Sequence, residues 1–238
     1  MIVVENLTKR YGDYLAVENV SFSVKKGEVL GFLGQNGAGK TTVMRMITGY
    51  LNPTSGTVSV GGFDVFEHPY EVKKLIGYLP ETPPLYDDMT VTSYLNFVSK
   101  MKGVTHADRN ERIEWVVEKC NLKDVTKRLI QNLSKGYRQR LGLAGALVHK
   151  PPVLIFDEPT VGLDPKQINE IRELIVSLKG DHLIILSSHI LPEVTVTCDR
   201  AIVIDRGHVI ADKKVKDLTG EQTLEHVFLE LIAKESLS

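Results

Sequence analysis

The sequence predicts an α/β fold in which a parallel sheet is joined to an antiparallel β part and interrupted by an inserted helical segment. Three observations lead to this prediction. Short apolar segments at 29–33, 153–156 and 183–186 are typical of buried strands, and helical spacing of apolar residues follows the first two. Strand, helix and strand in that order indicate a parallel sheet with right-handed crossovers. Helical periodicity then dominates most of 92–150.

The N-terminal part is expected to be rich in strands around a glycine-rich loop. Apolar residues alternate at 20–24 and 58–60, as they do in half-buried strands, and Gly61-Gly62 favours a turn. The chain has 238 residues, of which 42% are hydrophobic. It is therefore long enough for one large or two small lobes with a sizeable core.

Helices are expected in the middle of the chain, after the proline-rich segment 80–84. Asp164 is a suitable N-cap and Pro165 a suitable first residue for a further helix between two of the later strands. The three helices predicted in the inserted segment lie around 95–101, 113–120 and 141–148.

Three parts are expected along the chain. Residues 1–83 and 151–215 form a core lobe, 84–150 a helical subdomain, and 216–238 a C-terminal helical tail. In the tail, apolar residues between 224 and 232 recur at helical spacing, which predicts an amphipathic helix. Such a helix more often packs on its own domain than on a partner.

The segment Gly34–Thr42 matches the phosphate-binding loop pattern G-x-x-x-x-G-K-[ST]. A strand precedes it and a helix follows, so the loop leads to a helix N-terminus, where free backbone N–H groups and the dipole favour anions. Lys40 is expected to reach the β- and γ-phosphates, and the Thr41 hydroxyl to bind Mg²⁺. A mere glycine-rich turn is the alternative, which these flanks disfavour. The expected nucleotide contacts are Gly34, Asn36, Gly37, Ala38, Gly39, Lys40, Thr41 and Thr42.

Two carboxylates follow the buried strand at 153–156, at the carboxyl edge where parallel sheets bind ligands. Asp157 is expected to hold Mg²⁺ directly or through water, and Glu158 to orient and polarise a water for attack on the γ-phosphate. His189 follows a second strand and could hydrogen-bond the γ-phosphate and Glu158. A solvated strand end and a structural histidine are the alternatives. The phosphate loop disfavours the first, because Asp-Glu is its expected partner.

Composition excludes several classes of protein. The formal net charge of -1 gives no electrostatic footprint for nucleic acid, so none is expected as a partner. Cys120 and Cys198 are too few for a disulfide framework and are expected to be reduced thiols. No signal peptide and no apolar run long enough to cross a bilayer is evident, so any membrane connection is expected to come through a partner.

Several motifs together resemble an ATPase subunit of an ABC transporter over nearly the whole chain. The segment 133–140 is similar to the ABC signature, which distinguishes this family from other phosphate-loop enzymes. The resemblance implies a phosphate-loop NTPase (RecA-like) core and hydrolysis of ATP with Mg²⁺. The motifs that carry it are Gly34–Thr42, Leu133–Arg140, Leu154–Pro159, Gly162–Pro165 and Ser187–His189.

The same resemblance implies a head-to-tail dimer, formed with a second copy or with another ABC ATPase subunit. Ser134 and Gly136 of one subunit would close over the γ-phosphate held by the other, and Ser134 is also a plausible N-cap. Tyr11 would stack on adenine, although a tyrosine in a strand is otherwise usually a core residue. Asp164 would cross the dimer interface, although N-capping is already a sufficient local role.

Three residues depart from the commonest pattern of the family. Glu81 stands where a glutamine usually links Mg²⁺ and the attacking water to the membrane subunit, and it would add negative charge there. Lys135 and Tyr137 replace a glycine and a glutamine of the signature. Lys135 could favour phosphate or simply face solvent. These variations most resemble the exporter-type ATPases for drugs, polysaccharides or gliding-motility factors.

The resemblance implies a separate integral-membrane subunit as the partner, which would hold this chain at the inner face of the cell membrane, in the cytoplasm. Tyr86 and Met89, in the segment 81–90, are candidate contacts for a helix of that subunit, or else part of an inter-lobe linker. A soluble ABC ATPase that switches on nucleic acid or the ribosome is the alternative function. A kinase or GTPase on the same loop explains neither 133–140 nor His189.

Overall fold

The computed structural model describes residues 1–219 and 223–235. Residues 220–222 and 236–238, which belong to the expected tail 216–238, lie outside the described residues. The predicted α/β fold, with a parallel sheet, an antiparallel β part and inserted helices, is confirmed.

A six-stranded sheet forms the centre of the fold, in the order β10-β9-β3-β8-β7-β6. All neighbours are parallel except β10, which runs antiparallel to β9. The strand, helix and strand pattern predicted after residue 150 corresponds to β7, α6 (Pro165–Leu178) and β8. The strands are β3 (Val29–Leu33), β6 (Ile76–Leu79), β7 (Val153–Asp157), β8 (Leu183–Ser188), β9 (Arg200–Asp205) and β10 (His208–Lys214).

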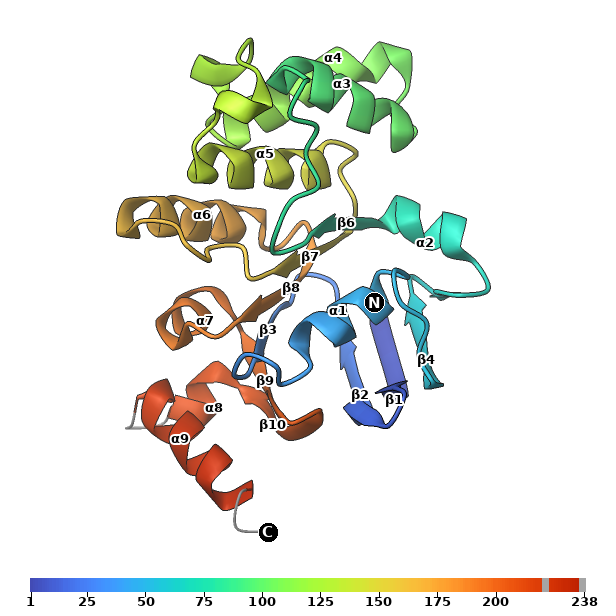
Figure 1. Cartoon of the computed structure of the whole chain (residues 1–238), viewed down its shortest axis with the longest axis vertical. Coiled ribbons are helices and arrows are strands. Elements are labelled where there is room, and N and C mark those ends of the chain that lie inside the picture. Colours follow the sequence, from blue (N-terminus) through green and yellow to red (C-terminus); the bar gives the residue numbers. More distant parts are fainter. Residues whose placement is uncertain (220–222, 236–238) are drawn as a thin grey trace.

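A second, antiparallel sheet has the order β2-β1-β4-β5. Its first hairpin places Tyr11 opposite Tyr14. Figure 1 shows this sheet beside the central one, with α1 (Lys40–Ile47) between them. The strands are β1 (Ile2–Tyr11), β2 (Tyr14–Val24), β4 (Ser55–Val60) and β5 (Phe63–Asp64).

The inserted helices gather at one end of the molecule (Figure 1). The last of these helices begins at Lys135, earlier than the predicted range 141–148. It begins there because Ser134 is its N-cap. The Ser134 hydroxyl accepts a hydrogen bond from the Tyr137 N–H at 3.4 Å. The helices are α3 (Val91–Met101), α4 (His106–Lys119) and α5 (Lys135–Leu147), with short 3₁₀ turns at Lys123–Val125 and Ile130–Asn132.

One helix that the sequence did not indicate precedes β6. It has seven residues, of which only Val72 is buried, so it leaves no periodic signal. The C-terminal helix packs against the helix that follows β8 and against β10, as expected of an amphipathic helix on its own domain. These and the remaining helices are α2 (Pro69–Leu75), α7 (Leu191–Thr197), α8 (Val215–Thr219) and α9 (Leu224–Glu235).

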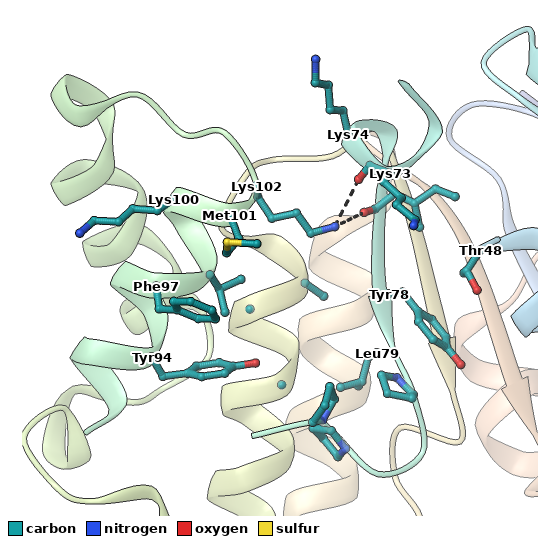
Figure 2. A pocket seen from close by; sticks show the side chains of 18 of the residues that line it. Thr48, Lys73, Lys74, Tyr78, Leu79, Tyr94, Phe97, Lys100, Met101 and Lys102 are labelled. Carbon is teal, nitrogen blue, oxygen red and sulfur yellow. Dashed lines mark hydrogen bonds between the residues drawn. The ribbon is translucent and has the colours of Figure 1, made fainter. Parts of the chain in front are cut away.

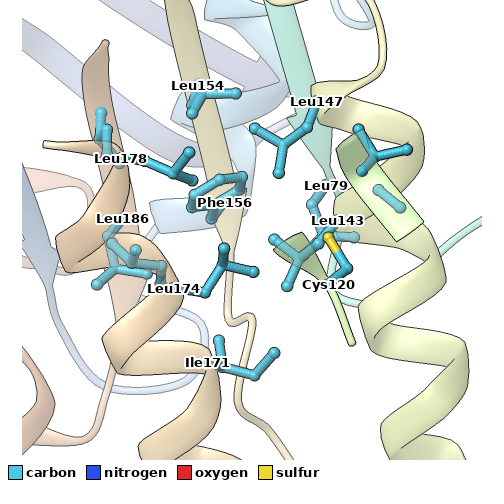
Figure 3. Packing of buried hydrophobic residues seen from close by; sticks show 14 of the residues in the cluster. Leu79, Cys120, Leu143, Leu147, Leu154, Phe156, Ile171, Leu174, Leu178 and Leu186 are labelled. Atoms are coloured by element: carbon cyan, nitrogen blue, oxygen red, sulfur yellow. The ribbon is translucent and has the colours of Figure 1, made fainter. Parts of the chain in front are cut away.

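Two apolar clusters cover the two faces of the central sheet. In β7, Leu154 and Phe156 join the cluster that α5 and α6 complete, while Val153 and Ile155 join the cluster around α1 and the antiparallel sheet. Figure 3 shows Phe156 between the leucines of α6 and those of α5. Burial on both faces explains the uninterrupted apolar sequence of β7 and brings its first carboxylate, Asp157, to the edge of the sheet.

Candidate functional site

The glycine-rich loop joins the end of β3 to the start of α1. Gly37 and Gly39 have φ of 83° and 105°, a conformation that favours glycine. A Cβ at Gly39 would lie 2.7 Å from the Ala16 carbonyl oxygen, so the loop passes too close to β2 for any larger residue. No side chain caps α1 and no acidic residue lies in its first turn. The first N–H groups of α1 are therefore free to bind an anion.

Lys40 lies inside this loop and is only 6% exposed. Its ammonium group donates hydrogen bonds to the carbonyl oxygens of Gly34 at 2.7 Å and Gln35 at 3.1 Å. It also lies 3.2 Å from Oε1 of Glu158. The loop thus curls around its own lysine and holds the charge over the end of β7, where incoming phosphate oxygens would compete for it.

Asp157 is buried at the end of β7, opposite Ser187 of β8. Its Oδ1 accepts hydrogen bonds from the hydroxyls of Ser187 at 2.5 Å and Thr41 at 3.2 Å. Its Oδ2 is buried and has no hydrogen-bond partner among the described residues. Burial raises the pKa of Asp157, and the two hydroxyl donors act against that shift. The Thr41 hydroxyl and the Asp157 carboxylate therefore lie together beside the phosphate loop.

Glu158 lies between two basic side chains. Its Oε2 is 2.8 Å from Nδ1 of His189, and its Oε1 faces Lys40. Its backbone has φ of 50°, in the left-handed region, and its N–H donates to the Ser187 hydroxyl at 3.0 Å. Because β7 and β8 are parallel neighbours in register, the residues that follow them meet at one edge. Strained backbone of this kind is often found at functional sites.

A hollow of about 490 Å³ opens above these groups. It is bounded by the phosphate loop, the β1–β2 hairpin and the ends of β6, β7 and β8. Tyr14, Ala16 and Val161 also line it and were not predicted. Of the predicted residues, those that line it are Tyr11, Asn36, Gly37, Gly39, Lys40, Thr41, Thr42, Glu81, Glu158 and His189.

The remaining predicted residues have other positions. Gly34 and Ala38 belong to the loop but do not line the hollow; a Cβ at Gly34 would lie 2.4 Å from the Ile204 carbonyl oxygen. Gly34 therefore lets the loop pack on β9.

The signature residues do not line the hollow either. Ser134 is exposed and caps α5. Asp164 caps α6 by accepting a hydrogen bond from the Gln167 N–H at 2.9 Å. A Cβ at Gly136 would lie 2.7 Å from the Gln167 side chain, so the start of α5 packs directly on the first turn of α6. The same chain thus carries the phosphate loop and the signature segment in separate places.

Both cysteines are free, as the sequence predicts. Cys120 and Cys198 are buried free thiols, and burial raises the pKa of each to about 12. None of the helices in the described ranges is both long and apolar enough to cross a membrane. Within those ranges, no group of three or more His, Cys, Asp or Glu side chains is arranged to hold a metal ion.

Comparisons with known proteins identify the family of this chain. Residues 17–161 match the ABC transporter family. The chain is 40% identical to the linearmycin resistance ATP-binding protein LnrL of Bacillus subtilis, over 92% of this chain and 70% of that protein. It is 39% identical to the ABC transporter ATP-binding protein NatA of the same organism, over 98% and 99% of the two chains.

A solved structure of the ATP-binding subunit of an ABC transporter superimposes with a TM-score of 0.89 at 29% identity, over 98% of this chain and 99% of that one. The family match covers more than half of the chain, and NatA aligns along nearly all of it. The chain therefore belongs to the ABC transporter family, as one of its ATP-hydrolysing subunits.

Proposed function

We propose that ATP binds in the hollow between the phosphate loop and Glu158, and that its hydrolysis here powers an ABC exporter. The observation that carries this proposal is the position of the Glu158 carboxylate. It lies at the edge of the sheet between Lys40 and His189, beside the Thr41–Asp157 pair. An acid–base group and a phosphate-binding cation meet there in a site built for an anion.

The triphosphate would lie along the loop, with its charge on the free N–H groups of α1 and on Lys40. Tyr11 is 46% exposed at the rim of the hollow, which supports its proposed role as the residue that stacks on adenine. Tyr14, which faces Tyr11 across the hairpin, offers a second ring at the same rim.

The residues present fit a magnesium ion. Asp157 has a buried oxygen without a hydrogen-bond partner in the described part of the chain, and the Thr41 hydroxyl lies beside its other oxygen. Hard oxygen ligands of this kind suit Mg²⁺, so Thr41 and Asp157 would hold it, with Glu81 as a further oxygen donor beside the hollow. When bound, the ion would neutralise charge on the phosphates.

Glu158 would orient the attacking water and accept its proton, because its carboxylate is held in place at both oxygens. His189 keeps one of these oxygens in position through the 2.8 Å contact. Phosphate oxygens that draw Lys40 toward themselves would leave the other oxygen of Glu158 free for the water. Binding of substrate and readiness of the base are linked in this way.

The site of one chain lacks the signature segment. Ser134, Gly136 and Asp164 lie outside the hollow of their own chain. The proposal is that they act on the nucleotide of a second ATPase subunit, either another copy or a related chain, arranged head to tail. The exposed Ser134 and the N-terminus of α5 that it caps would then meet the γ-phosphate across the interface.

A groove of about 550 Å³ lies between the core sheet and the helices α3 and α5. We propose that a separate membrane subunit binds at this groove. Figure 2 shows Tyr94, Phe97 and Met101 of α3 along this groove, with lysines around it. Tyr86 is 49% exposed and stacks edge-on against Phe97, with ring centroids 5.5 Å apart.

Tyr86 therefore stays a candidate contact for a helix of that subunit, which would hold this chain at the inner face of the membrane. Met89 is half-buried, packs on the core and does not line the groove, which favours a structural role for it. An exporter is proposed because LnrL, which aligns over 92% of this chain, is named as a linearmycin resistance protein. In this proposal residues 84–150 form the helical subdomain, which contains both the signature segment and part of the lining of the groove.

Replacement of Glu158 by glutamine tests the proposed reaction. Glu158→Gln keeps the shape of the side chain and removes the proton acceptor. ATP should bind with unchanged affinity while turnover falls on the order of 10²- to 10⁴-fold. Glu173→Gln, at an exposed position on α6, is the matched control and should leave both quantities unchanged. Near-normal turnover in Glu158→Gln would contradict the proposal.

A further inference from the structure

A glutamate outside the proposed site is completely buried directly behind it. Glu193, on α7, has 0% of its surface exposed and does not line the nucleotide hollow. Charged residues are seldom buried to this degree unless they are paired or neutral. Burial raises the pKa of Glu193, which favours the protonated carboxyl. Such a group needs hydrogen-bond partners, and the partners it has belong to the loops around Glu158.

One of these partners is Ser188, the last residue of β8, which directly precedes His189. The Ser188 hydroxyl donates to Oε2 of Glu193 at 2.6 Å and accepts from the Ile190 N–H at 3.0 Å. One hydroxyl thus closes the turn of the backbone that contains His189, and Glu193 holds that hydroxyl. The Glu193 N–H in turn donates to the Ile190 carbonyl oxygen at 3.1 Å.

A second loop reaches the same carboxyl. Thr160 is buried two residues after Glu158, and its hydroxyl lies close enough to favour the charged form of Glu193, although it does not meet the geometry of a hydrogen bond. The positive charge of Arg172 on α6 acts in the same direction, and the negative charge of Glu158 acts against it. The hydrogen bond of the Glu193 carboxyl therefore goes to Ser188, at the end of β8.

We infer that Glu193 is a positioning residue for ATP hydrolysis: through Ser188 it fixes the turn that sets His189 against Glu158. The inference rests on the proposed function. Small displacements of groups near reacting atoms can cost on the order of 10²-fold in rate. Loss of the Glu193 contact should therefore slow turnover without weakening the binding of ATP.

The test uses the full chain and measures ATP turnover per bound nucleotide, ATP affinity and thermal midpoint. Glu193→Ala should lower turnover by about tenfold at unchanged affinity, because the His189 turn is no longer fixed. Glu193→Gln keeps an oxygen that accepts from Ser188 and should stay close to wild type. Thr197→Val is the matched control. It removes a buried hydroxyl that donates to the Glu193 carbonyl oxygen in the same helix at 2.7 Å and lies 3.4 Å from the Cys198 sulfur. Neither contact involves the Glu193 carboxyl, so the change can lower stability but should not lower turnover.

The decisive comparison places the same changes in a His189→Ala background. If Glu193 acts through His189, Glu193→Ala should there cause little further loss, so the two effects should not add. Equal losses with and without His189 would overturn the inference, and so would a Glu193→Gln variant as slow as Glu193→Ala. If Glu193→Ala does not fold, Ser188→Ala takes its place in the same cycle. Failure of the inference leaves Glu158→Gln inactive, whereas failure of the proposed function leaves it active.

Discussion

The nucleotide hollow and the signature segment differ in how their polar residues are held. In the hollow, Lys40 and Glu158 are buried, as is Asp157 beside it, and all three are fixed by partners from the phosphate loop, β8 and the turn that follows β8. In the signature segment, Ser134 and Lys135 are exposed, and the Ser134 side chain only caps its own helix.

This difference indicates which part of the machinery one chain can complete alone. Buried charges that are held by several partners form a pre-organised site, because the cost of their desolvation is met during folding. Exposed residues at a helix N-terminus have no such organisation until another molecule covers them. We therefore propose that binding of ATP depends on the first region and that turnover depends on both.

Two lysines, one in each region, should differ most in how much their removal lowers turnover. Lys40→Ala removes a buried cation with three oxygen neighbours, so turnover should fall on the order of 10²- to 10³-fold and ATP affinity should weaken. Lys135→Ala removes an exposed cation beside Gly162 and should change turnover by less than about tenfold. Both are measured on the full chain by steady-state hydrolysis and by nucleotide titration.

Similar losses of turnover in the two lysine variants would contradict the proposed difference between the two regions. In that case the cation at Lys135 would contribute to phosphate binding as much as Lys40 does, and the signature segment would have to be regarded as part of the pre-organised site. Retained turnover in Lys40→Ala would remove the basis for placing the phosphates on the loop.

The hollow was largely predictable because its main parts are local in sequence. A strand, a glycine-rich loop and a helix N-terminus follow one another within Val29–Ile47, and the two carboxylates directly follow a buried strand. Parallel strands end at the same edge of a sheet, so the sequence could place His189 beside the two carboxylates. The pairing of Asp157 with Ser187 in the structure agrees with this reasoning.

What the sequence did not reveal depends on contacts between distant segments. Tyr14 and Ala16 reach the hollow only because β2 folds back on β1 and passes beside Gly39. The buried state of Glu193 gave no signal, because α7 is too short for a clear periodic pattern and a glutamate is ordinarily expected at the surface. The sequence makes Met89 a candidate contact for the membrane subunit, whereas in the fold Met89 is half-buried and packs on the core.

A smaller effect is expected from changes at Ser134, where capping and recognition can be separated. Ser134→Asp keeps an N-cap, so stability should be retained, whereas Ser134→Ala should lose about 1 kcal/mol. The new carboxylate would repel the γ-phosphate of a neighbouring subunit, and turnover should fall on the order of 10-fold or more, with ATP affinity of the single chain unchanged. Thermal unfolding and hydrolysis, measured together, check both parts.

A Ser134→Asp variant that hydrolyses ATP like wild type would show that the signature segment does not approach the nucleotide. Loss of stability together with loss of turnover would instead indicate that the two functions of Ser134 cannot be separated, and the comparison would then rest on the lysine pair alone.

We propose that each nucleotide binds between the hollow of one chain and the signature segment of another. Mixing Lys40→Ala subunits with Ser134→Asp subunits tests it most directly, because each heterodimer regains one site with an intact Lys40 and an intact Ser134. Heterodimers isolated through two different tags should hydrolyse ATP well above either parent homodimer. Isolated heterodimers that remain as inactive as their parents would contradict the claim.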